Sequence, residues 1–156
     1  MKPWRQSMRD AAAPTALATV TTLLTVALRG RHDSGSALAP INATSHVLWG
    51  PRAAASGRVT VNHTLPGLLI NAGATGFWAL VMERLFGARL DARGKAAAPV
   101  AAAATAALAY LTDYHLVPRR LTPGWEHRIS HRSLALAFGA LALGLGAGAA
   151  LARAQR

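Results

Sequence analysis

The side chains most capable of chemistry are concentrated in residues 108–133. This stretch holds Asp113 and Glu126, two of only six acidic residues, and three of the six histidines. Histidine with carboxylate binds Zn²⁺, copper or iron, ligates haem through the imidazole, or relays protons. The chain has no cysteine, which excludes disulfides, thiolate metal sites and cysteine nucleophiles. A metal or haem site is therefore the chemistry that these residue types support.

The candidate metal ligands lie at the ends of apolar runs and in one loop. They are His46, His63, Asp113 and His115. Asp113 and His115 are two residues apart, so they would converge only if the helix that carries them breaks there. His127 and His131 share a spacing of four, but no Glu follows His127 as the zinc-protease motif requires.

The structural interpretation of these residues is favoured over the chemical one. Histidines at a membrane surface act as hydrogen-bonded anchors, and Asp113 is expected to pair with Arg119 or Arg120 around the turn. The adjacent pairs Ser45-His46 and Ser130-His131 do not predict a Ser–His dyad, because sequence neighbours seldom form one. We therefore predict no cofactor and no catalytic residue, with metal or haem binding as the alternative.

The net charge of +11 does not predict nucleic-acid binding. The 17 Lys and Arg residues sit at the ends of apolar runs rather than in one patch, where anionic lipid headgroups would meet them. Lipid is the expected partner.

Four apolar runs predict four membrane-spanning helices. They cover about residues 11–28, 64–86, 96–117 and 133–152 and are apolar on every face, unlike the striped helices of soluble domains. About 20 residues cross a ~30 Å hydrocarbon core. We expect an all-α integral membrane four-helix bundle, with residues 1–156 as a single domain.

The connections between the runs carry further expectations. Residues 40–49 should form a short helix on the membrane surface, because Leu48 and Trp49 would share an apolar side with Ile41. Residues 87–95 should form a short basic loop. Glu83 would then lie in the last turn of the second span and reach the headgroups.

Small and polar residues mark the packing faces. Asn71 and Thr75 belong to a polar stripe along the second run, which should face other helices rather than lipid. The fourth run carries small residues at strict four-residue spacing, which allows close helix contact within the monomer or across a dimer. These are Ala140, Gly144, Gly148 and Ala152.

Four spans place both termini on one side and all six histidines on the other. The count of basic residues barely decides the orientation. The basic head comes first in the chain and the longest loop suits the outside, so we expect cytoplasmic termini.

Several motifs point to a family. They are Asn42-Ala43-Thr44-Ser45-His46, Phe77-Trp78-Ala79-Leu80, Pro118-x-Arg-Leu-Thr-Pro-Gly-Trp-Glu126 and Ser130-x-Arg-Ser133. With them the chain resembles a group of small, four-span, largely uncharacterised bacterial inner-membrane proteins. The resemblance implies that membrane and that fold, and no activity.

The expected function is that of a non-enzymatic accessory or envelope-structural membrane protein. It would assemble with itself or with a larger membrane complex through the small-residue faces of the third and fourth runs. One alternative is a membrane metal or haem protein, possibly redox. A weaker one is a small transporter lined by Asn71 and Thr75, since no span carries a charge at mid-depth.

Overall fold

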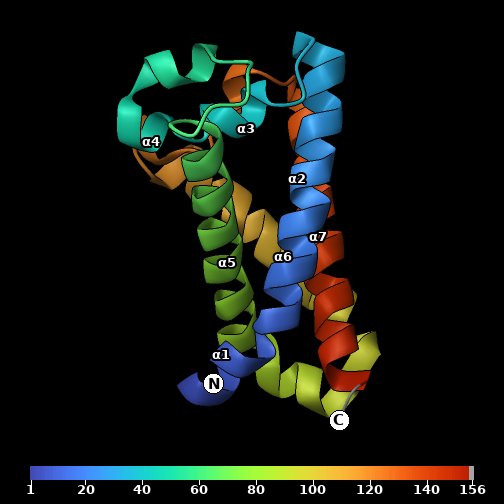
Figure 1. Cartoon of the computed structure of the whole chain (residues 1–156). Helices are drawn as coiled ribbons and strands as arrows, with labels where there is room; N and C mark the ends of the chain where they lie inside the picture. The colour runs from blue at the N-terminus through green and yellow to red at the C-terminus, as the bar shows by residue number, and fades with distance from the viewer. Residues whose placement is uncertain (155–156) are drawn as a thin grey trace. The chain divides into compact units, whose positions relative to one another are not determined.

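The computed structural model describes residues 1–154, and all regular structure within that range is helical (Figure 1). The last two residues of the predicted 1–156 domain, and the side chains of Arg52 and Ala54, lie outside the description. The four apolar runs form α2 (Ala12–Ser34), α5 (Thr64–Arg93), α6 (Ala98–Leu111) and α7 (His131–Ala154). The all-α prediction is confirmed, and α2, α5 and α7 are long and apolar enough to cross a membrane.

Two boundaries differ from the sequence-based prediction. The predicted loop at 87–95 is wrong, because α5 continues to Arg93 and passes through a 3-10 turn, Gly94–Ala96, before α6. The basic head also folds, as α1 (Trp4–Asp10). After α6 the backbone continues in a π-helical turn, Thr112–Leu116. The charged residues of the basic head and of the predicted loop therefore lie mainly on α1 and α5.

The first long connection is also built differently from the prediction. It contains α3 (Ala39–Ala43), α4 (His46–Trp49) and a 3-10 turn, Pro51–Ala55, in place of one surface helix at 40–49. Residues 39–46 are all buried, and only Leu48 and Trp49 at the end are largely exposed. The segment is therefore part of a protein core, because Asn42, Ser45 and His46 have hydrogen-bond partners there.

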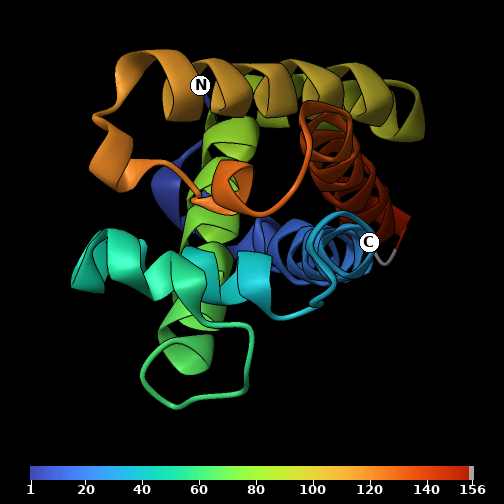
Figure 2. The same ribbon diagram turned by 90° about the horizontal axis from the view of Figure 1, so that it is seen from above.

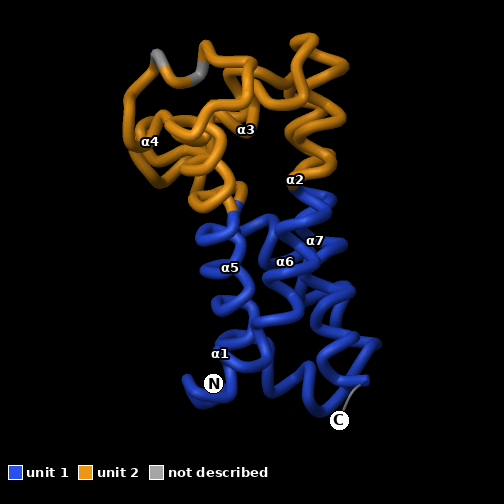
Figure 3. The backbone as a smooth tube through the Cα atoms, viewed as in Figure 1, with its two compact units in different colours: residues 1–22, 72–109, 138–156 blue, residues 23–71, 110–137 orange. Residues whose placement is uncertain are grey.

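The chain divides into two compact units (Figure 3). Unit 1 comprises residues 1–22, 72–109 and 138–156, and unit 2 comprises residues 23–71 and 110–137. Unit 2 also contains two 3-10 turns, Arg119–Leu121 and Trp125–His127. In Figure 2, α3 lies beside the segment that carries the second of these turns, and the two elements are in contact.

Glycines bring α7 against α2 in unit 1. A Cβ on Gly144 would lie 2.6 Å from the Ala18 backbone nitrogen, and one on Gly148 would lie 2.5 Å from the Pro14 nitrogen. The Thr21 hydroxyl donates a 2.9 Å hydrogen bond to the carbonyl of Ala140, also on α7. The small-residue face of the fourth run is therefore occupied within the chain, by the first predicted span.

Candidate functional site

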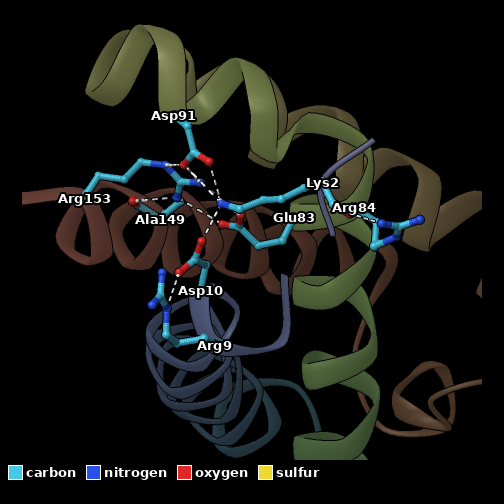
Figure 4. Close-up of polar contacts among 8 residues, drawn as sticks. All are labelled: Lys2, Arg9, Asp10, Glu83, Arg84, Asp91, Ala149 and Arg153. Atoms are coloured by element: carbon cyan, nitrogen blue, oxygen red, sulfur yellow. Dashed lines mark hydrogen bonds and ion pairs between the residues drawn. The ribbon is translucent and has the colours of Figure 1, made fainter. Parts of the chain in front are cut away.

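The largest polar cluster of unit 1 lies where α1, α5 and α7 meet (Figure 4). Lys2 Nζ forms ion pairs with Asp10, with Glu83 Oε2 at 3.3 Å and with Asp91 Oδ2 at 2.8 Å. Arg153 donates hydrogen bonds to both carboxylate oxygens of Glu83, at 3.0 and 2.9 Å, and forms an ion pair with Asp91 at 2.9 Å. We call Lys2, Asp10, Glu83, Asp91 and Arg153 the ion cluster.

The ion cluster is buried except at Asp91, which is exposed, and it is nearly balanced in charge. The side chains of Lys2 and Glu83 are 2% and 0% exposed. Three carboxylates face two cations, and Arg9 adds a further contact to Asp10 at 3.3 Å. Burial alone would lower the pKa of Lys2, but its hydrogen bonds to Asp10 and Asp91 and the charge of Glu83 outweigh burial and raise that pKa. Pairing of this quality is what a buried charge requires.

The same contacts hold the amino-terminal helix in place. Arg84 donates a hydrogen bond to the backbone carbonyl of Lys2, and its guanidinium lies 4.3 Å from the centre of the Trp4 ring. The arrangement binds α1 to α5 and α7 by charge. Chemically it is a structural lock, because every titratable group in it already has a partner of opposite charge.

The expectation that Glu83 reaches the headgroups is wrong. Because α5 does not end at Phe86, Glu83 lies ten residues before the end of the helix, where burial is complete. Residues 83, 87 and 91 are four apart and share one helix face. A Cβ on Gly87 would lie 2.5 Å from Lys2 Cδ, so this glycine makes room for the Lys2 side chain. The spacing of four is visible in the sequence, but the predicted loop begins at Gly87 and separates Glu83 from Asp91.

Two histidines of unit 2, His46 and His63, contact neighbouring polar groups of the protein. His46 is buried, and its Nδ1 lies 2.9 Å from the carbonyl oxygen of Ala43 and its Nε2 3.3 Å from that of Arg119. The His63 Nδ1 lies 3.1 Å from the Ser45 hydroxyl. The His46 ring also meets the His127 ring edge-on, with centroids 5.8 Å apart.

The structure does not gather the four candidate metal ligands. The exposed His115 contacts the Tyr110 ring, and within residues 1–154 Asp113 forms no ion pair with Arg119 or Arg120, so the expected pairing is wrong. Within the same range, no group of three or more histidines and carboxylates has metal-binding geometry. Metal binding by His46, His63, Asp113 and His115 stays a prediction without geometric support.

Glu126 and Asp33 are carboxylates of unit 2 that have several partners: Asp33 contacts Arg29, His32 and the Ser130 amide, and Glu126 lies in the connection between α6 and α7. Glu126 accepts hydrogen bonds from the Thr122 hydroxyl at 2.5 Å and the Tyr114 hydroxyl at 3.1 Å. Arg120 instead donates to the carbonyls of Val47 and Leu48. The bonds of Glu126 join residues within the connection between α6 and α7, and those of Arg120 join this connection to α4.

Asn42 is the central residue of the first connection. It is 0% exposed, and its amide nitrogen donates to the carbonyls of Ser56 and Arg58 at 3.0 and 2.8 Å. Its amide oxygen accepts from the Thr64 hydroxyl at 2.8 Å. One side chain thus joins α3, the loop and the start of α5, which gives the Asn42–His46 motif a structural role.

The polar stripe of α5 is buried, as predicted from its spacing. Asn71 and Thr75 are 5% and 4% exposed, while Leu69 and Phe77 on the other faces are 63% and 57% exposed. The stripe therefore faces protein, and the exposed apolar residues are suited to lipid.

No family model, curated protein or solved structure matches this chain.

Proposed function

We propose that this chain is a four-span integral protein of the bacterial inner membrane, with cytoplasmic termini and a non-enzymatic, accessory or envelope-structural role. Three helices long and apolar enough to span support the membrane assignment. Their outward side chains add to it, since Leu24, Leu28 and Leu143 are 59%, 69% and 73% exposed.

One observation supports a fourth span: two connections, far apart in the sequence, contact each other. In unit 2, the α2–α5 connection contacts the α6–α7 connection, because His46 bonds the Arg119 carbonyl and Arg120 bonds the Val47 carbonyl. Three spans would instead leave the α6–α7 connection on the side of the α5–α6 turn. Contact between the two connections supports a crossing by α6 as well.

The length of α6 fits this role. Its 14 α-helical residues continue into five π-helical ones, together roughly 28 Å at 1.5 Å per residue. That is close to the ~30 Å hydrocarbon core.

The polar groups support an accessory role because they are engaged in structural bonds. Glu83 is paired with two cations, Asn42 bonds backbone carbonyls and Thr64, and the His46 ring nitrogens lie 2.9 and 3.3 Å from two carbonyl oxygens. The face that remains for a partner helix is on α6, where Ala103, Ala104 and Ala107 are exposed. Small exposed residues let another backbone approach closely.

Single-cysteine labelling tests the four spans, since the chain has no cysteine. Val61, Ala92 and Leu116 are exposed and lie outside the proposed spans or at their ends. With a membrane-impermeant thiol reagent on sealed vesicles, Val61→Cys and Leu116→Cys should react from one side and Ala92→Cys from the other. Reaction of Leu116→Cys from the same side as Ala92→Cys would show that α6 does not cross.

Oligomeric mass in mild detergent tests the accessory role. We expect the wild-type protein to form a homo-oligomer or a defined complex that Ala107→Trp disrupts. The matched control is Leu143→Trp, an exposed position on α7, which should leave the mass unchanged. A monomeric wild-type protein, or equal effects of the two variants, would contradict assembly through α6.

A further inference from the structure

A cavity of about 170 Å³ opens in unit 1 where α5 ends and α6 begins. Phe86, Leu90, Val100 and Ala101 give it an apolar floor, and Arg89 and Arg93 line it as well. One water molecule occupies about 30 Å³ in the liquid, so the space accepts a group the size of a phosphate with its ester carbons. Apolar walls with two arginines define a site that is part hydrocarbon and part anion receptor.

The charge of this cavity is not neutralised by the protein. Arg89 and Arg93 are four residues apart on α5 and both are exposed. Among residues 1–154, neither has an ion pair with a carboxylate, and no acidic residue lines the cavity. Asp91, which lies between them in sequence, is held by Lys2 and Arg153 in the ion cluster.

The position of the cavity fits its chemistry. It lies at the end of an apolar helix that is long enough to span, where the ester and phosphate groups of a lipid would be found. The first turn of α6 lines the cavity through Val100 and Ala101, and the amino end of a helix carries a positive partial charge. Basic pockets between spans are suited to anionic headgroups.

We infer that this cavity binds one anionic phospholipid. Its phosphate would be held by Arg89 and Arg93, and the first carbons of its acyl chains would lie on Phe86 and Val100. The inference rests on the proposed membrane insertion, and it adds a specific ligand class to a protein otherwise described only by its architecture. Arginine suits the role because its planar fork donates two hydrogen bonds to phosphate oxygens.

Native mass spectrometry of the full chain in mild detergent tests the site. The probes are dioleoyl phosphatidylglycerol, dioleoyl phosphatidylcholine and inorganic phosphate. The double variant Arg89→Gln/Arg93→Gln should bind phosphatidylglycerol at least tenfold more weakly than wild type. The control Arg31→Gln/Arg132→Gln, which removes two exposed arginines of unit 2, should stay within twofold.

A second variant separates loss of the site from loss of the fold. Val100 is 69% exposed in the first turn of α6, where a carboxylate favours the helix. Val100→Glu should keep the helical circular dichroism of the wild type and lose phosphatidylglycerol binding, because it places a negative charge against the two arginines.

Three outcomes would overturn the inference. They are equal affinity for phosphatidylglycerol and phosphatidylcholine, equal weakening by the two double variants, and displacement of the lipid by inorganic phosphate at equal concentration, which would show a simple anion site. Thiol labelling of the same preparations reports insertion separately. Correct insertion without lipid selectivity refutes the site alone, whereas failed insertion refutes the proposed function.

Discussion

Replacing Gly144 by alanine should force α7 away from α2. The added Cβ would lie 2.6 Å from the Ala18 nitrogen and closer still to the Ala18 Cα and the Thr21 hydroxyl. Carbon atoms in good contact are about 3.5–4.0 Å apart. The obstacle is largely backbone, which cannot rotate aside as a long side chain would. The two helices must therefore separate by about 1 Å.

The cost follows from comparison with a second glycine of the same helix. Overpacking of a well-packed contact costs about 1–3 kcal/mol. Any glycine in a helix gains about 1 kcal/mol when it becomes alanine. Gly139 has nothing within 4 Å of its would-be Cβ, so Gly139→Ala carries the gain without the clash. The propensity term cancels between the two variants, and they should differ by about 1–3 kcal/mol, with Gly144→Ala the less stable.

Reversible unfolding in mixed micelles, followed by circular dichroism during a titration with sodium dodecyl sulfate, measures this difference. Thr21→Val gives an independent reading, because it removes the hydrogen bond to the Ala140 carbonyl without adding volume at Gly144. Its effect should shrink in the Gly144→Ala background, where the helices are already apart. Equal stability of Gly144→Ala and Gly139→Ala would refute the close contact.

Three further predictions concern the buried polar groups. Glu83→Gln should lower stability by about 1–3 kcal/mol in the same assay, because it removes charge-assisted bonds to Lys2 and Arg153, which then keep only Asp10 and Asp91 as carboxylate partners; unchanged stability would contradict the ion cluster. The pKa of Lys2 is raised, so its ion pairs stabilise the fold fully below the ordinary lysine pKa, and this stabilisation is lost as pH rises through the raised pKa. Lys2→Met should abolish this dependence of stability on pH. Asn42→Ala should lose about 1–3 kcal/mol of local stability, so trypsin should cleave this variant after Arg58 about tenfold faster than wild type. Asn62 is exposed, and trypsin should cleave Asn62→Ala at the wild-type rate.

The apolar runs were predictable because their signal is local. Lengths near 20 residues and the lack of charge predict spanning helices without any knowledge of neighbours. The burial of Asn71 and Thr75 followed from helical periodicity in the same way. Even Gly144 and Gly148 were recognisable as a close-packing face, although the sequence did not say that α2 would be the partner.

The ion cluster was not predictable in this way, because its members come from the start, the middle and the end of the chain. Lys2 and Arg153 are brought together only by the packing of α1 and α7 on α5. The error at Gly87 had a physical origin. Glycine commonly ends helices, but here its missing side chain leaves space for another residue, and nothing local distinguishes the two uses.

The ion cluster also constrains the order in which the protein is completed. Lys2 is synthesised well before Arg153, and synthesis proceeds at about 5–20 residues per second. For several seconds Glu83 and Asp91 have only Lys2 as a cationic partner from the cluster. The Arg153 guanidinium, which donates to both oxygens of Glu83, is synthesised with the final turn of α7. A chain that stops short of that turn keeps its apolar helices but carries an excess negative charge in its interior, because three carboxylates then share Lys2.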